Sequence, residues 1–212
     1  MNNQATIETL RRSWNKISWN RPDHGCLIGF DAILGRYQRP GRHYHDLRHL
    51  VECLEHSEID KARNPTAVRL ALFFHDYIYD TEVHHGNEEA SADFVSLYVA
   101  TWLQDPSDAY TACHHILATE KHKVGTVPET IQDSKLVIDC DLSILGRPMD
   151  RYAQYESDIQ LEYSHVPSQI FKEARRTIML GFLNRKDIYF NESFRERYDK
   201  QARKNISVYW SR

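Results

Sequence analysis

Apolar residues recur along most of the chain at spacings of three and four positions, the pattern of amphipathic helices. Strand-like alternation joined by Asn-Gly or Asp-Gly turns is absent from the sequence. The pattern therefore predicts an all-α helical bundle of about ten helices. These helices are expected over residues 5–19, 24–38, 43–58, 66–79, 87–103, 107–119, 130–145, 149–164, 168–184 and 191–209.

Two of these helices contain stretches that are apolar on nearly all sides, residues 67–74 and residues 136–145. Helices of this kind belong in the middle of a bundle. The first stretch is nevertheless followed at once by the pair His75-Asp76, and the second contains Asp139 and Asp141. Acidic groups at positions that should be dry indicate a role for these carboxylates, or ion pairs that compensate them.

Composition and charge favour a soluble protein without a polyanionic partner. Hydrophobic residues make up 41% of the chain and charged residues 27%, and the net charge of −3 gives no basic footprint for nucleic acid or an anionic membrane. No stretch approaches the ~20 apolar residues that span a bilayer, and the N-terminus lacks the apolar run of a signal peptide. We therefore expect a cytoplasmic protein with reduced, mostly buried thiols at Cys26, Cys53, Cys113 and Cys140.

The first candidate motif is a histidine pair, His45 and His49, within the predicted helix 43–58. On a helix, residues four apart share one face, so two imidazoles could address one site. They would act as two metal ligands, or as one ligand beside a proton donor. The alternative is a solvent-exposed pair on an amphipathic helix.

The second motif is the pair His75-Asp76. An ionised carboxylate at the end of a buried helix costs several kcal/mol unless something compensates it, and a bound cation does so directly. An imidazole beside a carboxylate suits Mn, Fe, Zn, Ni or Co better than a hard cation such as Mg. The alternative is a local hydrogen-bonded pair that faces water.

The third motif is Asp139-Cys140-Asp141. Residues two apart on a helix point about 200° apart, so Asp139 and Asp141 cannot both bind one ion. We expect one of them to face a site and the other to pair with a cation such as Lys135.

Taken together, the three motifs form the pattern H…HD…D, and the chain resembles the HD superfamily of metal-dependent phosphohydrolases. It is most similar to an uncharacterised bacterial group of predicted HD phosphohydrolases, with a distant similarity to the cyclic-nucleotide phosphodiesterases. The resemblance covers nearly the whole chain. It implies one HD-type domain over residues 1–212, with a metal-site core at about 43–145 and helices over 149–209 packing on it. The stretches that carry it are residues 44–49, 75–80, 87–92, 139–146 and 202–205.

The resemblance also implies roles for individual residues. His45 would be the proton donor, and Asp76 or Asp141 would help to orient the attacking water. Because Arg42-x-x-His45 also fits the setting of the first ligand in other HD branches, the roles of His45 and His49 could be reversed. Tyr79 departs from the phosphodiesterase pattern, which puts their second metal and cyclic-nucleotide hydrolysis in doubt. The implied metal ligands are His49, His75, Asp76 and Asp141.

The expected activity is hydrolysis of a phosphate ester or anhydride in a nucleotide or another small phosphorylated metabolite, with a divalent ion (Mn, Fe, Zn, Ni, Co or Mg) as cofactor. Arg48, Lys121 and His122 are the candidates for holding phosphate oxygens. One alternative is a catalytically silent HD domain that binds a nucleotide or metal. Another is a di-iron oxidase that would use His114, His115 and His122. The sequence also leaves undecided whether the aromatic-rich C-terminus forms a homodimer interface.

Overall fold

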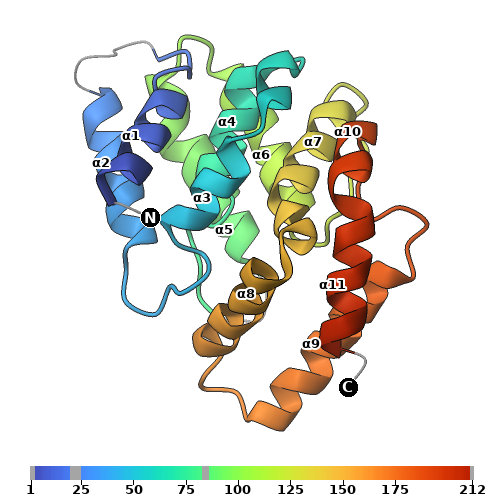
Figure 1. Cartoon of the computed structure of the whole chain (residues 1–212). Helices are drawn as coiled ribbons and strands as arrows, with labels where there is room; N and C mark the ends of the chain where they lie inside the picture. Colours follow the sequence, from blue (N-terminus) through green and yellow to red (C-terminus); the bar gives the residue numbers. More distant parts are fainter. Residues whose placement is uncertain (1–2, 20–24, 83–85, 211–212) are drawn as a thin grey trace. The chain divides into compact units, whose positions relative to one another are not determined.

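The fold is all-α, as the hydrophobic pattern predicts (Figure 1). The computed structural model describes residues 3–19, 25–82 and 86–210. Within these ranges there is no β-strand, and the one β-type pairing is an isolated bridge between Trp19 and Leu103. No helix in the described ranges combines the length and the apolar character needed to cross a membrane.

The chain divides into two compact units, Met1–Asp141 and Leu142–Arg212. The expectation of one domain over residues 1–212 stays a prediction. The first unit contains α1 (Asn3–Trp14), α2 (Gly25–Tyr37), α3 (Leu47–Leu54), a 3₁₀ helix (Ser57–Lys61), α4 (Pro65–Phe74), α5 (Asn87–Phe94), a π turn (Val95–Val99), a 3₁₀ turn (Ala100–Trp102), α6 (Ser107–Thr119) and all but the last residue of α7 (Ile131–Leu142).

Helix α4 is the centre of the first unit, packing against α3 and α6 (Figure 1). It begins where the sequence provides a start signal: the side chain of Asn64 accepts a hydrogen bond from the backbone N–H of Ala67 at 3.0 Å, and Pro65 occupies the first turn. Every residue from Thr66 to Phe74 is buried. This confirms that the apolar stretch 67–74 lies inside the bundle.

The predicted helix 43–58 is too long, and this is the main correction to the expected elements. Only Leu47–Leu54 is α-helical, because Asp46 caps the helix. Its carboxylate accepts hydrogen bonds from the backbone N–H groups of Arg48 (2.8 Å) and His49 (3.2 Å). His45 therefore lies in the turn before α3 and does not share a helical face with His49.

The second unit contains a 3₁₀ turn (Ser143–Gly146), α8 (Met149–Glu162), α9 (Ser168–Leu183), α10 (Glu192–Phe194), a π turn (Arg195–Asp199) and α11 (Lys200–Trp210). Helix α11 packs against α8, α9 and the 3₁₀ turn. The amide of buried Asn205 donates to the carbonyl oxygens of Leu145 (2.8 Å) and Arg147 (2.7 Å). A Cβ at Gly146 would collide with the backbone of Tyr198, so this approach requires glycine.

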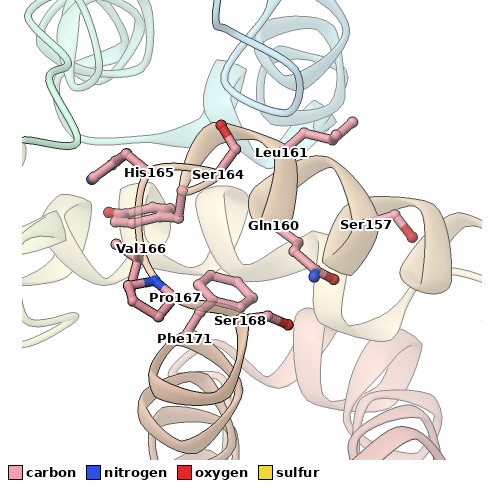
Figure 2. Close-up of a pocket in the computed structure, with 10 residues that line it drawn as sticks. Ser157, Gln160, Leu161, Ser164, His165, Val166, Pro167, Ser168 and Phe171 are labelled. Atoms are coloured by element: carbon pink, nitrogen blue, oxygen red, sulfur yellow. The ribbon is translucent and has the colours of Figure 1, made fainter.

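A cavity of about 630 Å³ lies at the turn between α8 and α9 in the second unit (Figure 2). Its lining includes the rings of Tyr163 and Phe171 and the apolar side chains of Val166 and Pro167. His165 is the one lining residue with a titratable imidazole. The lining is thus mainly apolar and has none of the clustered acidic and imidazole groups that distinguish the first unit.

Candidate metal centre

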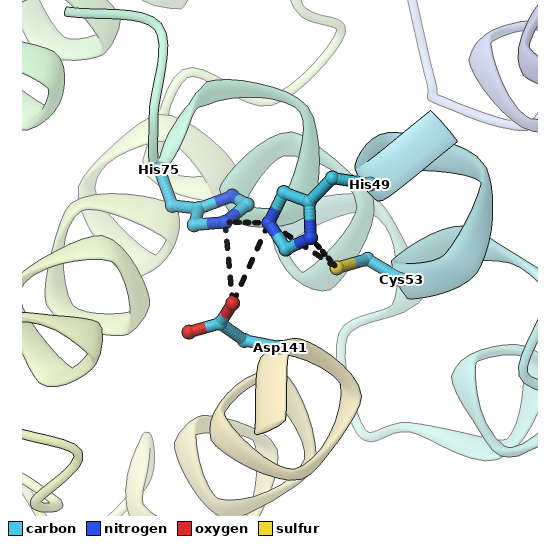
Figure 3. A group of neighbouring side chains, drawn as sticks. All are labelled: His49, Cys53, His75 and Asp141. Atoms are coloured by element: carbon cyan, nitrogen blue, oxygen red, sulfur yellow. Dashed lines mark hydrogen bonds and ion pairs between the residues drawn. The ribbon is translucent and has the colours of Figure 1, made fainter. Parts of the chain in front are cut away.

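Four side chains of the first unit place their potential ligand atoms within 4.8 Å of one another: His49, Cys53, His75 and Asp141. His49 and Cys53 come from α3, His75 caps the C-terminus of α4, and Asp141 lies near the end of α7 (Figure 3). This cluster, which is buried apart from partly exposed Asp141, could hold a metal ion.

The two imidazoles and two carboxylates meet at distances that suit a small cation. The Nε2 atoms of His49 and His75 are 3.1 Å apart, and Oδ1 of Asp141 lies 3.5 Å and 3.7 Å from them. Oδ2 of Asp76 lies 3.3 Å from Nε2 of His49 and 2.9 Å from Nε2 of His75. Ligand atoms of a tetrahedral Zn-like ion are separated by about 3.3 Å. His49, His75, Asp76 and Asp141 therefore lie close together, and their role as metal ligands stays a prediction.

The orientation of His75 turns a lone pair towards this centre. Nδ1 of His75 lies 3.0 Å from the carbonyl oxygen of Leu72, which can only accept a hydrogen bond, so Nδ1 carries the hydrogen. In the neutral ring Nε2 is then an acceptor, and it faces Oδ2 of Asp76, a buried atom without a hydrogen bond in the described part of the chain. Two acceptors at this distance repel unless a cation or a proton lies between them. The donor set thus fits a divalent ion.

The charges of the cluster lead to the same conclusion. Burial by itself lowers the pKa of His75, but the negative charges of Asp76 and Asp141, which face its ring, outweigh this and raise that pKa well above its usual value. Burial likewise raises the pKa of Asp76, yet His75, His45 and His49 together hold it well below its ordinary range. Burial also raises the pKa of Asp141, but His122 and His75 together hold it well below its ordinary range. Ionised carboxylates buried at this centre need a compensating positive charge, which a proton on His75 or a divalent ion would supply.

Cys53 lies beside the cluster rather than within the lone-pair region of His49. Its Sγ is 3.7 Å from Nδ1 and also 3.7 Å from Nε2 of the His49 ring. A sulfur equidistant from both ring nitrogens faces the ring and does not lie beyond Nε2, where an ion would bind. Burial also raises the pKa of the Cys53 thiol well above its usual value. We therefore interpret Cys53 as a packing partner of His49.

His45 reaches the edge of the cluster from the turn before α3. Its ring centroid lies 4.2 Å from that of Tyr79, 4.8 Å from that of Tyr44 and 5.6 Å from that of His49. Because His49 is the histidine whose Nε2 contacts His75, this geometry favours His49 over His45 as the metal ligand, and the role of His45 stays a prediction.

His122 also reaches the centre, and its backbone conformation explains how. It has a φ of 48°, in the left-handed region, and lies three residues after the last residue of α6. This conformation brings its Nε2 to 3.3 Å from Oδ2 of Asp141. Strained backbone at non-glycine residues is common at functional sites.

The other predicted site residues make no such contact with the metal-ligand cluster in the described part of the chain. Lys121 is exposed and pairs with Glu120 at 3.3 Å, and Arg48 is half-buried in the first turn of α3. His115 is fully buried and its Nδ1 contacts Oγ of Ser134 at 2.8 Å, which gives it a structural partner away from the cluster. As expected for residues that diverge on a helix, Asp141 faces the cluster while Asp139 is fully buried.

Sequence reasoning missed Glu88, in the first turn of α5. Its carboxylate is half-buried, and burial together with the charges of Asp76 and Glu120 raises its pKa. It also missed the packing of Cys53, which the spacing of four from His49 could have suggested. The thiols of Cys53 and Cys140 are buried and that of Cys113 is half-buried, and none of these three forms a disulfide bond. The side chain of Cys26 and the first position of the predicted helix 24–38 lie outside the described residues.

No protein-family model matches the chain, and the comparisons with curated proteins and with solved structures give no match either.

Proposed function

We propose that this protein is a metal-dependent phosphohydrolase that cleaves a phosphate ester or anhydride of a nucleotide or another small phosphorylated metabolite. The observation that carries the proposal is the approach of Oδ2 of Asp76 to Nε2 of His75 at 2.9 Å, with the other ring nitrogen of His75 committed to Leu72. A pair of acceptors arranged in this way, beside His49 and Asp141, is typical of a site for a divalent ion.

The proposed ligands are His49, His75, Asp76 and Asp141, and the ion would be Mn, Fe, Zn, Ni, Co or Mg. When bound, such an ion supplies Lewis acidity towards a phosphoryl oxygen and lowers the pKa of a water molecule. Asp76 would also help to orient the attacking water.

The proton donor in this proposal is His45, which protonates the departing oxygen of the substrate. Its ring lies against Tyr79 at the edge of the cluster, close enough for its charge to lower the pKa of Asp76. His122, beside Asp141, and Arg48 and Lys121 are the proposed contacts for phosphate oxygens. The free thiols of Cys53 and Cys113 suit a reducing compartment, and we propose the cytoplasm.

The test is phosphate release from a panel of nucleotides and phosphomonoesters, with each of the six metals added in turn. The wild type is compared with Asp76→Asn, which keeps the shape of the side chain, and with Asp93→Asn, which changes an exposed carboxylate. We expect metal-dependent turnover in the wild type and in Asp93→Asn, and none in Asp76→Asn. Silence across the panel, with a metal bound stoichiometrically, would favour a nucleotide- or metal-binding regulatory module instead.

A further inference from the structure

Arg42 connects the two chain segments that carry the histidines of the metal centre. Its Nη1 donates to the carbonyl oxygen of His45 at 3.0 Å, and its Nη2 donates to the carbonyl oxygens of Asp76 at 2.7 Å and Tyr77 at 3.1 Å. One side chain therefore ties the turn that leads into α3 to the turn that follows α4, across 34 and 35 positions of sequence.

The guanidinium of Arg42 is itself held in place by aromatic rings. Its Cζ lies 4.7 Å from the ring centroid of Tyr37 and 5.4 Å from that of Tyr79. Tyr37 is buried, and its hydroxyl donates to the carbonyl oxygen of Phe73 in α4 at 3.1 Å. Tyr79 is the ring against which His45 packs at a tilt of 35°. The position of Arg42 is thus coupled to α4 and to the proposed proton donor.

We propose that Arg42 is a positioning residue that sets the affinity of the centre for its metal ion. The carbonyl group that it holds most closely belongs to Asp76, so the hydrogen bond fixes the backbone from which the carboxylate extends. The carbonyl of His45 immediately precedes the cap residue of α3, the helix that carries His49. Three of the five N–H donors of Arg42 are thus committed to backbone carbonyls, which suits a positioning role. The inference rests on the metal site of the proposed function.

Lysine cannot replace Arg42 in this arrangement. A guanidinium is a planar fork that can donate to three carbonyls from two nitrogens while its faces contact aromatic rings. An ammonium is a compact point charge, and it loses the fork as well as the stacking. Arg42→Lys is therefore expected to behave like Arg42→Gln and not like the wild type.

The test is the dissociation constant for Zn²⁺ and Co²⁺, measured without substrate by competition with a chelator. The variants are Arg42→Lys, Arg42→Gln and Arg42→Ala, with Arg39→Gln as the matched control because Arg39 is exposed on the same segment. The folded fraction of each variant is measured by circular dichroism, so that affinity is compared between folded proteins. Mutating a residue that orients a metal ligand through a hydrogen bond typically weakens metal binding by about 10- to 100-fold.

We expect the three Arg42 variants to bind both metals about 10- to 100-fold more weakly, Arg39→Gln to be unchanged, and added guanidinium to restore affinity in Arg42→Ala. If Arg42 only stabilised the fold, the variants would be less stable, but their folded fraction would bind metal with wild-type affinity. Added guanidinium would then not change the metal affinity of Arg42→Ala. Wild-type affinity in folded Arg42→Gln would overturn the inference, as would a wild type that binds neither metal. A wild type that binds metal with this dependence on Arg42 but releases no phosphate would overturn the proposed function alone.

Discussion

The carboxylate of Asp46 accepts a hydrogen bond from the backbone N–H of His49 at 3.2 Å, so the residue that starts α3 also orients the turn that carries the first proposed ligand. Asp46 accepts a second hydrogen bond from the N–H of Arg48 at 2.8 Å. A negative charge at this end of a helix is favoured by the helix dipole as well. The cap therefore places His49 within the first turn of α3, where a shift of the helix start would move its ring.

Replacing Asp46 by alanine is expected to lower the free energy of unfolding by about 1 kcal/mol, because two backbone N–H groups lose their acceptor. Asp46→Asn keeps an oxygen in the same place and is expected to retain most of the stability. Urea unfolding of the metal-free proteins measures both. Equal losses for the alanine and asparagine variants would show that the cap hydrogen bonds do not hold the start of α3.

The parts of the fold that could be predicted are those dominated by apolar periodicity. Helix 107–119 has the predicted bounds, and the apolar stretches within α4 and α7 are buried. The predicted start of α3 was wrong because the side chain of Asp46 caps the helix there, although its neighbours continue the helical pattern of apolar residues. The predicted helix 87–103 changes into a π turn at Val95–Val99, a local change in hydrogen bonding that leaves no mark in the spacing of apolar residues.

The candidate site was predictable where burial and charge conflict in the sequence. Asp76 and Asp141 stood out because carboxylates are costly inside apolar helices, and the structure brings both to His75. The contacts of Arg42 could not be predicted, because its partners are backbone carbonyls and backbone carries no sequence signal. The metal itself and the substrate stay predictions.

Replacing Cys53 by alanine is expected to leave one metal ion bound per chain, because Sγ faces the His49 ring and does not lie beyond Nε2. Cobalt-loaded wild type should accordingly show no thiolate-to-metal charge-transfer absorption. Asp76→Ala, by contrast, is expected to lose the ion. A near-ultraviolet charge-transfer band that disappears in Cys53→Ser would instead identify the sulfur as a ligand.

The left-handed backbone of His122 predicts a difference between two substitutions. His122→Ala and His122→Gly both remove the contact with Asp141, so their difference isolates the backbone. Glycine adopts a φ of 48° without the steric cost that a Cβ brings, and His122→Gly is expected to be more stable than His122→Ala by about 1 kcal/mol. Denaturant unfolding at neutral pH gives the comparison, and a more stable alanine variant would contradict the backbone assignment.

The buried imidazole of His115 is expected to make stability depend on pH. Burial is the main cause that lowers the pKa of His115 from 6.5 to about 4, with a smaller contribution from His114, while Asp133 opposes them. As pH falls, His115 is protonated in the unfolded chain before it is protonated in the folded protein. Above pH 6.5 it therefore does not lower the free energy of unfolding, and between pH 6.5 and about 4 it lowers that free energy progressively. The full loss from a shift of this size is roughly 3 kcal/mol.

Urea unfolding of chelator-treated protein at several pH values measures this loss. His115→Gln lacks the titrating group, so its stability should fall less steeply than that of the wild type across this range, whatever its stability at neutral pH. His43→Gln is the control, because His43 is exposed, and it should keep the wild-type slope. If the free energy of unfolding of His115→Gln fell with pH as steeply as that of the wild type, the prediction would be wrong. His115 would then accept its proton in the folded protein as readily as in the unfolded chain. Burial of the ring does not permit this without a structural opening around Ser134.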